Sequence, residues 1–264
     1  ASPIIDPLLK TNTTQNMKAM IFAAGLGTRL RPITQQIPKA LVEVGGVPMI
    51  EHVIVNLKAA GVDSIIINLH HFPEKIKNFI ASRDHFNIEI RYSDESYRLL
   101  DTGGGLRKAG WFFDDDQPFV LHNADVLTNL ELNKMMHNHL KEKCLATLFV
   151  MQRKTSRYLM FDQDMQLTGW KNVKTGEEKI SRKAELVSDF AFNGIHIIQP
   201  EIFNLLPKHG KFSIISAYLD IAINHKIAGY RDPVAGFVDI GRPENLEEAE
   251  RFVKKIRDHS TRDE

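Results

Sequence analysis

The stretch KAMIFAAGLGTRLRP, residues 18–32, joins a short apolar run to a loop with two glycines, a threonine and two arginines. The apolar run predicts a buried strand, and the glycines predict a loop at its carboxyl end. In α/β sheets, ligands bind where parallel strands end. Gly25 and Gly27 let backbone N–H groups approach a phosphate, Thr28 adds a hydroxyl donor, and Arg29 offers a bidentate cation. The stretch therefore predicts an anion-binding loop on an α/β sheet.

The alternation of apolar runs and amphipathic segments continues along the chain. Apolar runs predict further strands at residues 64–69, 88–93, 118–125 and 145–152. Apolar residues at helical spacing predict helices between these strands, at residues 48–61, 73–84 and 130–143. This order of elements is typical of βαβ units on a mostly parallel sheet.

The pattern changes after residue 152. Residues 158–177 consist of short β-prone pieces around polar turns, which predict an antiparallel hairpin region. The remaining runs predict a core strand, a helix, a strand and a final helix, at residues 192–198, 213–225, 235–241 and 242–259. We predict one Rossmann-like α/β domain, residues 17–264, whose mixed, mostly parallel sheet is flanked by helices and carries a small antiparallel subregion on the substrate side. No six-residue repeat follows the last helix, so we expect no left-handed β-helix domain.

The composition is that of an ordinary globular protein. Of 264 residues, 43% are hydrophobic and 25% are charged, which is enough to bury a core. The formal net charge is +1, so the overall charge does not indicate binding to nucleic acid or to an acidic membrane. The single cysteine, Cys144, excludes an internal disulfide and is expected to be a small buried hydrophobe. No apolar run reaches the ~18 residues of a membrane span, and we expect a cytoplasmic protein.

Residues 1–16, ASPIIDPLLKTNTTQN, precede the first predicted strand. They lack the basic start and apolar centre of a signal peptide. Because Met17 stands directly before the strand, we interpret residues 1–16 as an upstream extension, a tag remnant or a mobile tail outside the fold.

Two common phosphate-binding motifs are absent from the glycine loop. The pattern G-x-G-x-x-G would need glycine where Leu30 stands, and the P-loop pattern G-x-x-x-x-G-K-[ST] does not occur. Pro32 and Pro38 interrupt an immediate helix, so we expect residues 31–41 to continue as an extended, lid-like segment that ends near Lys39. Arg29 and Lys39 are either solvated loop charges or phosphate ligands, and their grouping with the glycines favours phosphate binding.

Residues 23–34, AAGLGTRLRPIT, and residues 38–57, PKALVEVGGVPMIEHVIVNL, resemble the signature of the sugar-1-phosphate nucleotidyltransferases, G-x-G-[ST]-R followed by P-K. That family joins a nucleoside triphosphate to a sugar 1-phosphate and releases a nucleotide sugar and pyrophosphate. The resemblance implies that Arg29 and Lys39 are catalytic. It also implies a nucleotide-binding role for the loop residues Ala24, Gly25, Gly27 and Thr28.

Two aspartates stand at predicted strand exits. Asp125 ends the run FVLHNAD, and Asp239 lies in FVDIG. Nucleotidyl transfer needs a metal to neutralise phosphate charge, and Mg²⁺ uses only one or two carboxylates. The alternative is that each aspartate caps the following helix or turn. HNADVL is similar to the family's strand-ending G-D, although Ala124 replaces glycine, and FVDIGRPENLEEAE is similar to its D-x-G-x-P-E motif. The resemblance implies that Asp125 and Asp239 hold Mg²⁺.

A second glycine cluster, DTGGGLRKAG, covers residues 101–110. Three consecutive glycines before a helix predict a close approach to something flat or anionic, with a flexible loop as the alternative. The resemblance places Thr102, Gly103 and Gly104 against the nucleobase. Asn68, at another strand exit, is a further candidate nucleotide ligand, whereas we expect Glu95 to be solvated at the surface.

The predicted sugar side depends on the resemblance. Asn193 and Gly194, in FNGIHII, are similar to the family's sugar-contacting strand. Lys171, in TGWKNV, lies where the family usually has E-K-P and uses the lysine to bind the sugar phosphate. Trp170 and Asn172 replace the flanking glutamate and proline, so an ordinary hairpin lysine stays an alternative.

The resemblance implies that a sugar phosphate oxygen attacks the α-phosphorus of the triphosphate, without a general base. We expect UTP or GTP and a sugar 1-phosphate as partners, and a monomer or small homo-oligomer. The chain looks most like the N-acetylmuramate-1-phosphate uridylyltransferases of cell-wall recycling. Alternatives are a mannose- or heptose-1-phosphate guanylyltransferase, a choline-phosphate cytidylyltransferase and a noncatalytic nucleotide-sugar-binding regulatory protein. A dehydrogenase would need the missing third glycine and a ribose-binding acid.

Overall fold

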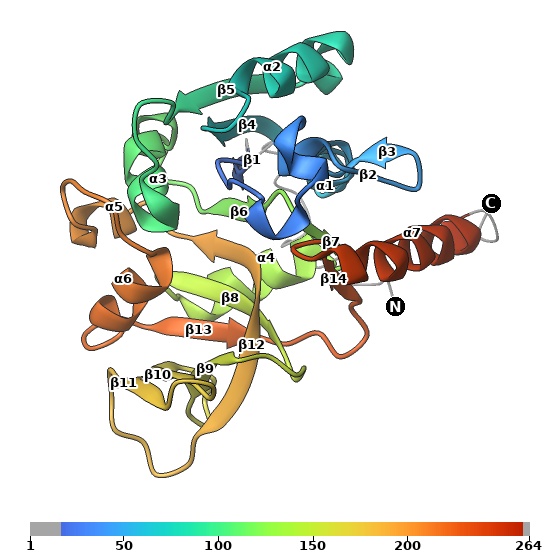
Figure 1. The fold of residues 1–264 in the computed structure, drawn as a ribbon. Helices are drawn as coiled ribbons and strands as arrows, with labels where there is room; N and C mark the ends of the chain where they lie inside the picture. The colour runs from blue at the N-terminus through green and yellow to red at the C-terminus, as the bar shows by residue number, and fades with distance from the viewer. Residues whose placement is uncertain (1–16, 261–264) are drawn as a thin grey trace, which may run out of the picture.

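The computed structural model describes residues 17–260, which form a large mixed sheet between two layers of helices (Figure 1). The parallel strands of this sheet lie in the order β6, β1, β4, β5. They span Phe119–Asn123 (β6), Met17–Phe22 (β1), Val62–Leu69 (β4) and Glu89–Asp94 (β5). All their carboxyl ends therefore meet at one edge, which is where the glycine loop leaves β1.

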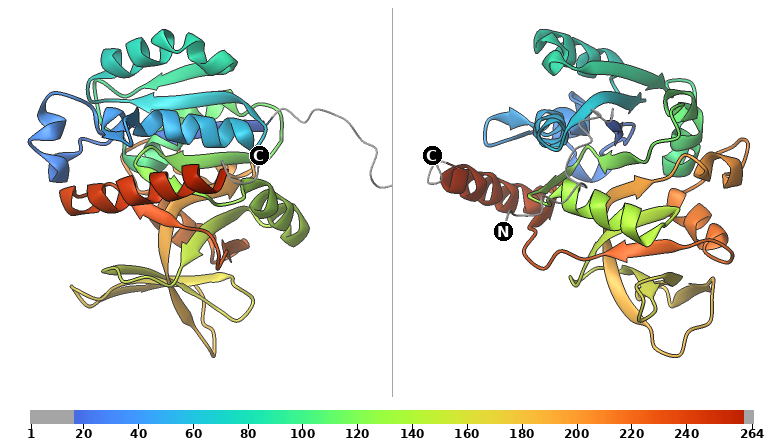
Figure 2. Two further views of the ribbon diagram at one scale, coloured as in Figure 1. Left: turned by 90° about the vertical axis from the view of Figure 1, so that its right-hand side faces the viewer. Right: turned by 180° about the vertical axis from the view of Figure 1, so that it is seen from behind.

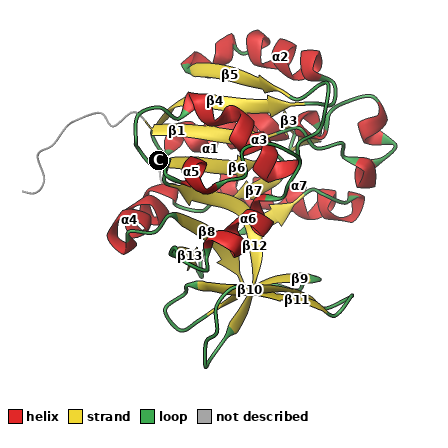
Figure 3. Cartoon of the chain, turned by 90° about the vertical axis from the view of Figure 1, so that its left-hand side faces the viewer, coloured by secondary structure: helices red, strands yellow, loops and turns green. Residues whose placement is uncertain are grey.

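Strand β12 (Ser188–Ile198) runs antiparallel to β6 and extends the sheet in two directions. One branch continues through β8 (Ala146–Met151) to the parallel β13 (Ile227–Tyr230). The other branch is an antiparallel layer of β9 (Arg157–Phe161), β10 (Leu167–Asn172) and β11 (Glu177–Ile180) (Figure 3). This layer confirms the predicted hairpin region.

Alternating side chains along the strands bury both faces of the sheet. Met20 and Leu121 pack on one face with α3 (Asp101–Ala109), α5 (Ile202–Leu205) and α6 (Ile214–Ile221). Ile21 and Val120 pack on the other face with α1 (Met49–Ala59), α2 (Pro73–Ser82) and α4 (Leu132–Glu142) (Figure 2). Cys144 is buried as expected, and burial raises the pKa of its thiol.

A short two-stranded ribbon lies beside the carboxyl edge of the main sheet. Its strands are β7 (Val126–Thr128) and β14 (Phe237–Asp239), and we call it the β7–β14 ribbon. The ribbon packs with β2 (Glu43–Val44), which pairs with β3 (Val47–Pro48), and with α7 (Leu246–Ser260) around a small third core that contains Leu127, Val238 and Val253. This core fixes the ribbon, and with it the two candidate metal-binding aspartates, Asp125 directly before β7 and Asp239 at the end of β14.

Two local expectations were wrong. Residues 101–109 form helix α3, so the three glycines lie inside a helix and not before it. Residues 31–41 are not extended, because 3₁₀ turns form at Ile33–Gln35 and Lys39–Leu41, after a first such turn at Thr28–Leu30. The prolines prevent a regular helix but permit these single turns. The predicted extension, residues 1–16, lies outside the described residues, and within 17–260 no helix is long and apolar enough to cross a membrane.

Candidate active site

The glycine loop leaves the carboxyl end of β1. Ala23 and Ala24 are buried, whereas Gly25 is exposed and has no atom within 4 Å of the position that a Cβ would occupy. Gly27 has φ +62°, a left-handed conformation that favours glycine, and its carbonyl accepts a hydrogen bond of 2.7 Å from the Thr34 hydroxyl. The loop is therefore held in a defined turn with an open outer surface.

Lys39 connects the segment after the glycine loop to both candidate metal-binding aspartates. Its ammonium group is hydrogen-bonded to the Asp125 carboxylate and lies 3.9 Å from Asp239 Oδ1. The Lys39 side chain is only 12% exposed, so water screens these contacts weakly. Arg29 is exposed at the surface, and its Nη2 atom lies 3.0 Å from the position of a Cβ on Gly241, beside Asp239. The structure thus brings Arg29, Lys39, Asp125 and Asp239 together.

The β7–β14 ribbon explains why the two aspartates meet. Asp125 lies directly before β7, and Asp239 is paired with Val126 at the end of β14. Burial raises the pKa of Asp239, and the negative charge of Asp125 raises it further, while Lys39 and Arg29 oppose these effects. Because Asp125 and Asp239 bring two negative charges into one partly buried space, they favour binding of a cation in addition to Lys39 and Arg29.

This donor set fits Mg²⁺ in number and chemistry. Within residues 17–260, no group of three or more His, Cys, Asp or Glu side chains is placed to bind a metal ion. Asp125 and Asp239, which both face the Lys39 ammonium group, offer two hard oxygen ligands. Magnesium commonly binds one or two carboxylates and completes its octahedron with waters and phosphate oxygens.

A cavity of about 490 Å³ opens beside Asp239 and extends toward the antiparallel layer. Its wall includes Trp170 and Lys179 from β10 and β11, Phe192 from β12, and Ser213 before α6. The cavity combines an aromatic surface, hydroxyl groups and a cation, which suits a polar ring that carries a negative charge.

The predicted sugar-side residues lie near this cavity but have other partners. Lys171 Nζ is 2.5 Å from Asp189 Oδ2, in an ion pair on the antiparallel layer. Asn193 is buried, and its Oδ1 accepts a hydrogen bond of 2.9 Å from Arg153 Nε. Gly194 has φ +75°, and a Cβ there would collide with the Asn123 side chain. The sugar-binding roles of Lys171, Asn193 and Gly194 stay predictions.

Arg153 was missed by the sequence analysis. Besides Asn193, it donates a hydrogen bond of 2.9 Å to the Phe192 carbonyl, and its guanidinium lies 4.6 Å from the centre of the Phe237 ring. Burial lowers the pKa of Arg153, and the charge of Asp239 opposes this shift. The only sequence signal was an arginine directly after a predicted strand, which is too common to indicate a site.

Asn68 lies beneath the glycine loop and connects it to a buried glutamate. Its Oδ1 accepts a hydrogen bond of 2.8 Å from the Ala23 N–H, and its Nδ2 donates one of 2.8 Å to Glu95 Oε1. The other Glu95 oxygen accepts a hydrogen bond of 3.0 Å from the Leu100 N–H. The expectation of a solvated Glu95 was wrong, since this residue is 1% exposed. Asn68 therefore positions the loop, and its contact with a nucleotide stays a prediction.

The α3 glycines are buried against the protein's own chain. The Gly103 and Gly104 N–H groups donate to the Phe212 carbonyl at 2.9 and 3.2 Å, and Thr102 Oγ1 accepts from the Ile214 N–H at 2.9 Å. A Cβ on Gly104 would lie 2.5 Å from the Gly210 carbonyl oxygen. The close approach that the glycines predicted is thus made in this structure by residues 210–214. The contact of Thr102, Gly103 and Gly104 with a nucleobase stays a prediction.

Replacing Gly105 with alanine is expected to destabilise the fold. The added Cβ would lie 2.6 Å from Glu95 Oε1 and 3.0 Å from Asn68 Nδ2. This overpacking should cost about 1–3 kcal/mol and outweigh the ~1 kcal/mol that alanine gains in a helix. Denaturant unfolding of Gly105→Ala measures the loss. Gly25→Ala is the control, expected within about 0.5 kcal/mol of the wild type because the space there is open. Equal stability of the two variants would contradict this account of Gly105.

Comparison with known proteins identifies the family. A sequence model of the family described as Nucleotidyl transferase matches residues 18–256. The chain belongs to this family. The structure of HddC from Yersinia pseudotuberculosis complexed with GMP-PN superposes with a TM-score of 0.72 at 23% identity, over 90% of this chain and 99% of that one. The predicted family, the nucleotidyltransferase class and the Rossmann-like fold are confirmed.

The relatives of this chain differ in the substrates that their names give. The chain is 30% identical over 214 residues to UTP–glucose-1-phosphate uridylyltransferase of Synechocystis sp., covering 75% of this chain and 53% of that protein. It is 29% identical over 235 residues to N-acetylmuramate alpha-1-phosphate uridylyltransferase of Caulobacter vibrioides, covering 86% and 92%. It is 29% identical over 237 residues to mannose-1-phosphate guanyltransferase of Yarrowia lipolytica, covering 87% and 62%. The chain therefore spans about half of the first relative and nearly all of the second.

Proposed function

We propose that this chain transfers a nucleotidyl group from a nucleoside triphosphate to a sugar 1-phosphate, with UTP as the preferred donor. The observation that carries the proposal is the contact of Lys39 with both Asp125 and Asp239, beside the glycine loop and next to the 490 Å³ cavity that Asp239 lines. Membership of the Nucleotidyl transferase family supports the same reaction class.

The triphosphate is proposed to lie along the glycine loop. The open surface at Gly25 admits a phosphate chain close to the backbone, and Arg29 and Lys39 supply positive charge next to it. The sugar 1-phosphate lies in the cavity beside Asp239, with its ring near Trp170 and its phosphate directed toward the loop. This placement brings the two reacting groups together without a covalent enzyme intermediate.

In the proposed reaction, an oxygen of the sugar phosphate attacks the α-phosphorus of the triphosphate in line with the departing group. A new phosphorus–oxygen bond forms, the bond to the β-phosphate breaks, and pyrophosphate leaves with its electron pair. The attacking phosphate is already ionised at neutral pH, so no general base is needed. Arg29 and Lys39 stabilise the negative charge that moves onto the departing pyrophosphate.

Asp125 and Asp239 would hold Mg²⁺, which neutralises phosphate charge when bound. In the structure, Lys39 balances these carboxylates. Lys39 is free to turn toward a phosphate only when another cation balances the aspartates. The proposal therefore assigns Lys39 two alternative partners, the carboxylate pair in the free protein and a phosphate group in the complex.

The preference for UTP is supported by two relatives. The Synechocystis and Caulobacter proteins are both named uridylyltransferases, and the Caulobacter protein matches this chain over 92% of its length. The similarity to the mannose-1-phosphate guanyltransferase of Yarrowia lipolytica makes GTP the second candidate donor. A cell-wall sugar such as N-acetylmuramate 1-phosphate is the first acceptor to test.

Pyrophosphate release tests the proposal directly. The full chain is incubated with Mg²⁺ and UTP, GTP, CTP, ATP or dTTP, each with a panel of sugar 1-phosphates and with phosphocholine. We expect release that requires both Mg²⁺ and a sugar 1-phosphate and that is fastest with UTP. Release with a sugar 1-phosphate and GTP, but with none of the other triphosphates, would indicate a guanylyltransferase. Release that requires phosphocholine would indicate a choline-phosphate cytidylyltransferase. No release with any pair, combined with nucleotide binding in a thermal shift assay, would reject the catalytic proposal in favour of a regulatory binding protein.

A further inference from the structure

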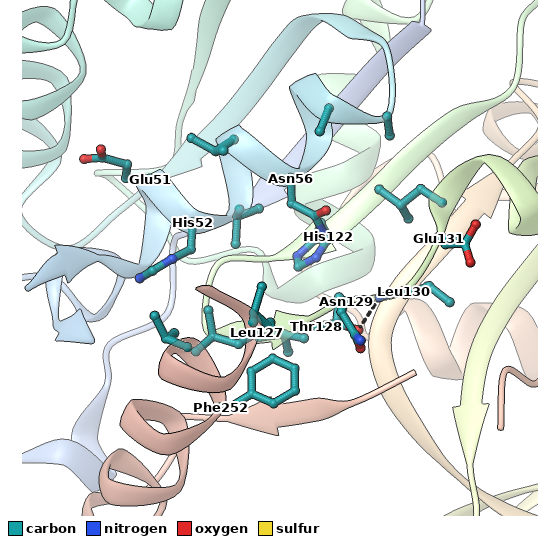
Figure 4. Close-up of a pocket in the computed structure, with 18 of the residues that line it drawn as sticks. Glu51, His52, Asn56, His122, Leu127, Thr128, Asn129, Leu130, Glu131 and Phe252 are labelled. Carbon is teal, nitrogen blue, oxygen red and sulfur yellow. Dashed lines mark hydrogen bonds between the residues drawn. The ribbon is translucent and has the colours of Figure 1, made fainter. Parts of the chain in front are cut away.

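A second cavity, of about 740 Å³, lies away from the carboxylate pair. It opens between α1 and α7, and β7 forms its inner wall (Figure 4). Its apolar wall includes Val53, Leu127, Phe252 and Val253. The volume is within the range of small-molecule sites, about 300–1,000 Å³. None of the groups assigned to nucleotidyl transfer lines this cavity.

His122 supplies an unsatisfied hydrogen-bonding atom at the inner end of the cavity. The residue is 1% exposed, and its Nε2 has no hydrogen-bond partner. His122 Nδ1 lies 2.8 Å from the Asn123 carbonyl oxygen, which can only accept, so Nδ1 carries the proton of this hydrogen bond. Burial lowers the pKa of His122 to about 4, which keeps the ring neutral at physiological pH. Nε2 is therefore a bare acceptor.

A buried acceptor without a donor costs free energy, on the order of 1–3 kcal/mol, unless a bound molecule supplies the donor. Asn56 of α1 extends its carboxamide toward the His122 ring and adds a second polar group at the same end (Figure 4). Val53, Val126 and Leu127 supply apolar surface, and the cavity wall also includes the polar or charged residues Glu51, His52, Glu131 and Arg257. The cavity therefore fits a compact, uncharged, mainly apolar molecule with a hydroxyl or N–H donor at its buried end.

The position of the cavity connects it to the active site. Leu127 and Thr128 line the cavity and are paired with Val238 and Phe237 in the β7–β14 ribbon. The same ribbon ends in Asp239 and begins directly after Asp125. A molecule that moves β7 would therefore change the spacing of the two carboxylates.

We propose that this cavity is a binding site for a small apolar alcohol or N–H donor, recognised by His122 Nε2 and Asn56 and enclosed by α1, α7 and β7. The site is distinct from the glycine loop and from the 490 Å³ cavity. Its proposed occupant is an effector of the β7–β14 ribbon and takes no part in the chemical step.

Matched probes test this proposal independently of catalysis. The full chain is titrated with 1-naphthol and with naphthalene, and also with the smaller pairs phenol and toluene, cyclohexanol and methylcyclohexane. Amide NMR follows the residues of both cavities. We expect saturable shifts at Asn56, Leu127 and Phe252, tighter binding of the alcohols than of the hydrocarbons, and a smaller shift at Val238. Lys179, in the other cavity, is expected to stay unshifted.

Two variants separate the roles of His122 and of the cavity volume. His122→Phe keeps an aromatic ring but removes the acceptor, so alcohol affinity should fall about tenfold while hydrocarbon affinity stays the same. Ala59→Trp, at the exposed edge of the cavity, should weaken both kinds of probe, and Ala59→Ser should weaken neither. No alcohol binding to the wild type, shifts confined to other surfaces, or equal alcohol affinity in a folded His122→Phe variant would overturn the proposal. If His122→Phe does not fold, equal binding of the probes to Ala59→Trp and Ala59→Ser would overturn it in the same way.

Discussion

Lys39→Ala is expected to lower kcat for nucleotidyl transfer by about a thousandfold, the cost of removing one preorganised charge from a developing transition state. Lys39 lies between the glycine loop and the Asp125–Asp239 pair, and its side chain is only 12% exposed. Arg29, the other cation beside Asp239, is exposed to solvent, so we expect it to compensate only weakly for the loss of Lys39. Steady-state pyrophosphate release with saturating Mg²⁺ measures the loss.

The stability of Lys39→Ala should change much less than its activity. Truncation removes the main counter-charge of two carboxylates, so we expect a loss of about 1–2 kcal/mol at neutral pH, partly restored by Mg²⁺. Lys77→Ala is the matched control, because Lys77 pairs with Glu74 at 2.7 Å on the exposed side of α2. Surface pairs of this kind contribute about 0–1 kcal/mol, and kcat should stay unchanged. Wild-type kcat in Lys39→Ala would remove Lys39 from the catalytic machinery.

The main strands and helices could be predicted because burial dictates their sequence. Residues 65–67 are three consecutive isoleucines, since parallel strands are covered on both faces, and β4 includes this stretch. The short strands β2, β3 and β7 have two or three residues each and carry no periodicity that a sequence could show. The 3₁₀ turns after the glycine loop were missed for the same reason, because prolines exclude regular helix but do not specify what replaces it.

The sequence predicted the residues that the structure brings together wherever a motif coincides with the end of a predicted strand. Arg29 and Lys39 are far in sequence from Asp125 and Asp239, yet parallel strands and the β7–β14 ribbon bring all four to one edge. Glu95 was expected at the surface because none of its neighbours in the sequence indicates that its side chain is buried. Its environment comes from Asn68 and Leu100, which contact it only in the folded chain. The glycines of α3 likewise signalled a close approach without indicating that residues 210–214 make it.

Asp239→Asn is expected to lower the activity of the protein and to raise the stability of its metal-free form. Loss of one carboxylate from the proposed Mg²⁺ site should lower kcat by about a thousandfold, because the α-phosphate then lacks a properly held cation. The melting temperature of the metal-free variant should nevertheless rise at neutral pH. Burial and the charge of Asp125 raise the pKa of Asp239, so its ionised form costs stability in the folded protein. Asparagine removes that charge and can still accept the hydrogen bond from the Gly241 N–H.

The pH dependence of stability tests independently whether the Asp239 charge destabilises the folded protein. A carboxyl whose folded pKa is raised takes up its proton more readily in the folded state, so the wild type regains stability as pH falls through that raised pKa. The advantage of Asp239→Asn should therefore be largest at neutral pH and disappear toward the ordinary value of 3.8. Asp114→Asn is the control with the opposite sign, because hydrogen bonding to Lys18 lowers the pKa of Asp114 at the surface. That variant should keep full activity and should not gain stability. A metal-free Asp239→Asn protein that melts below the wild type at neutral pH would contradict this account. It would show that Lys39 and Arg29 already outweigh the charge of Asp125, so that the carboxylate pair does not favour binding of a further cation.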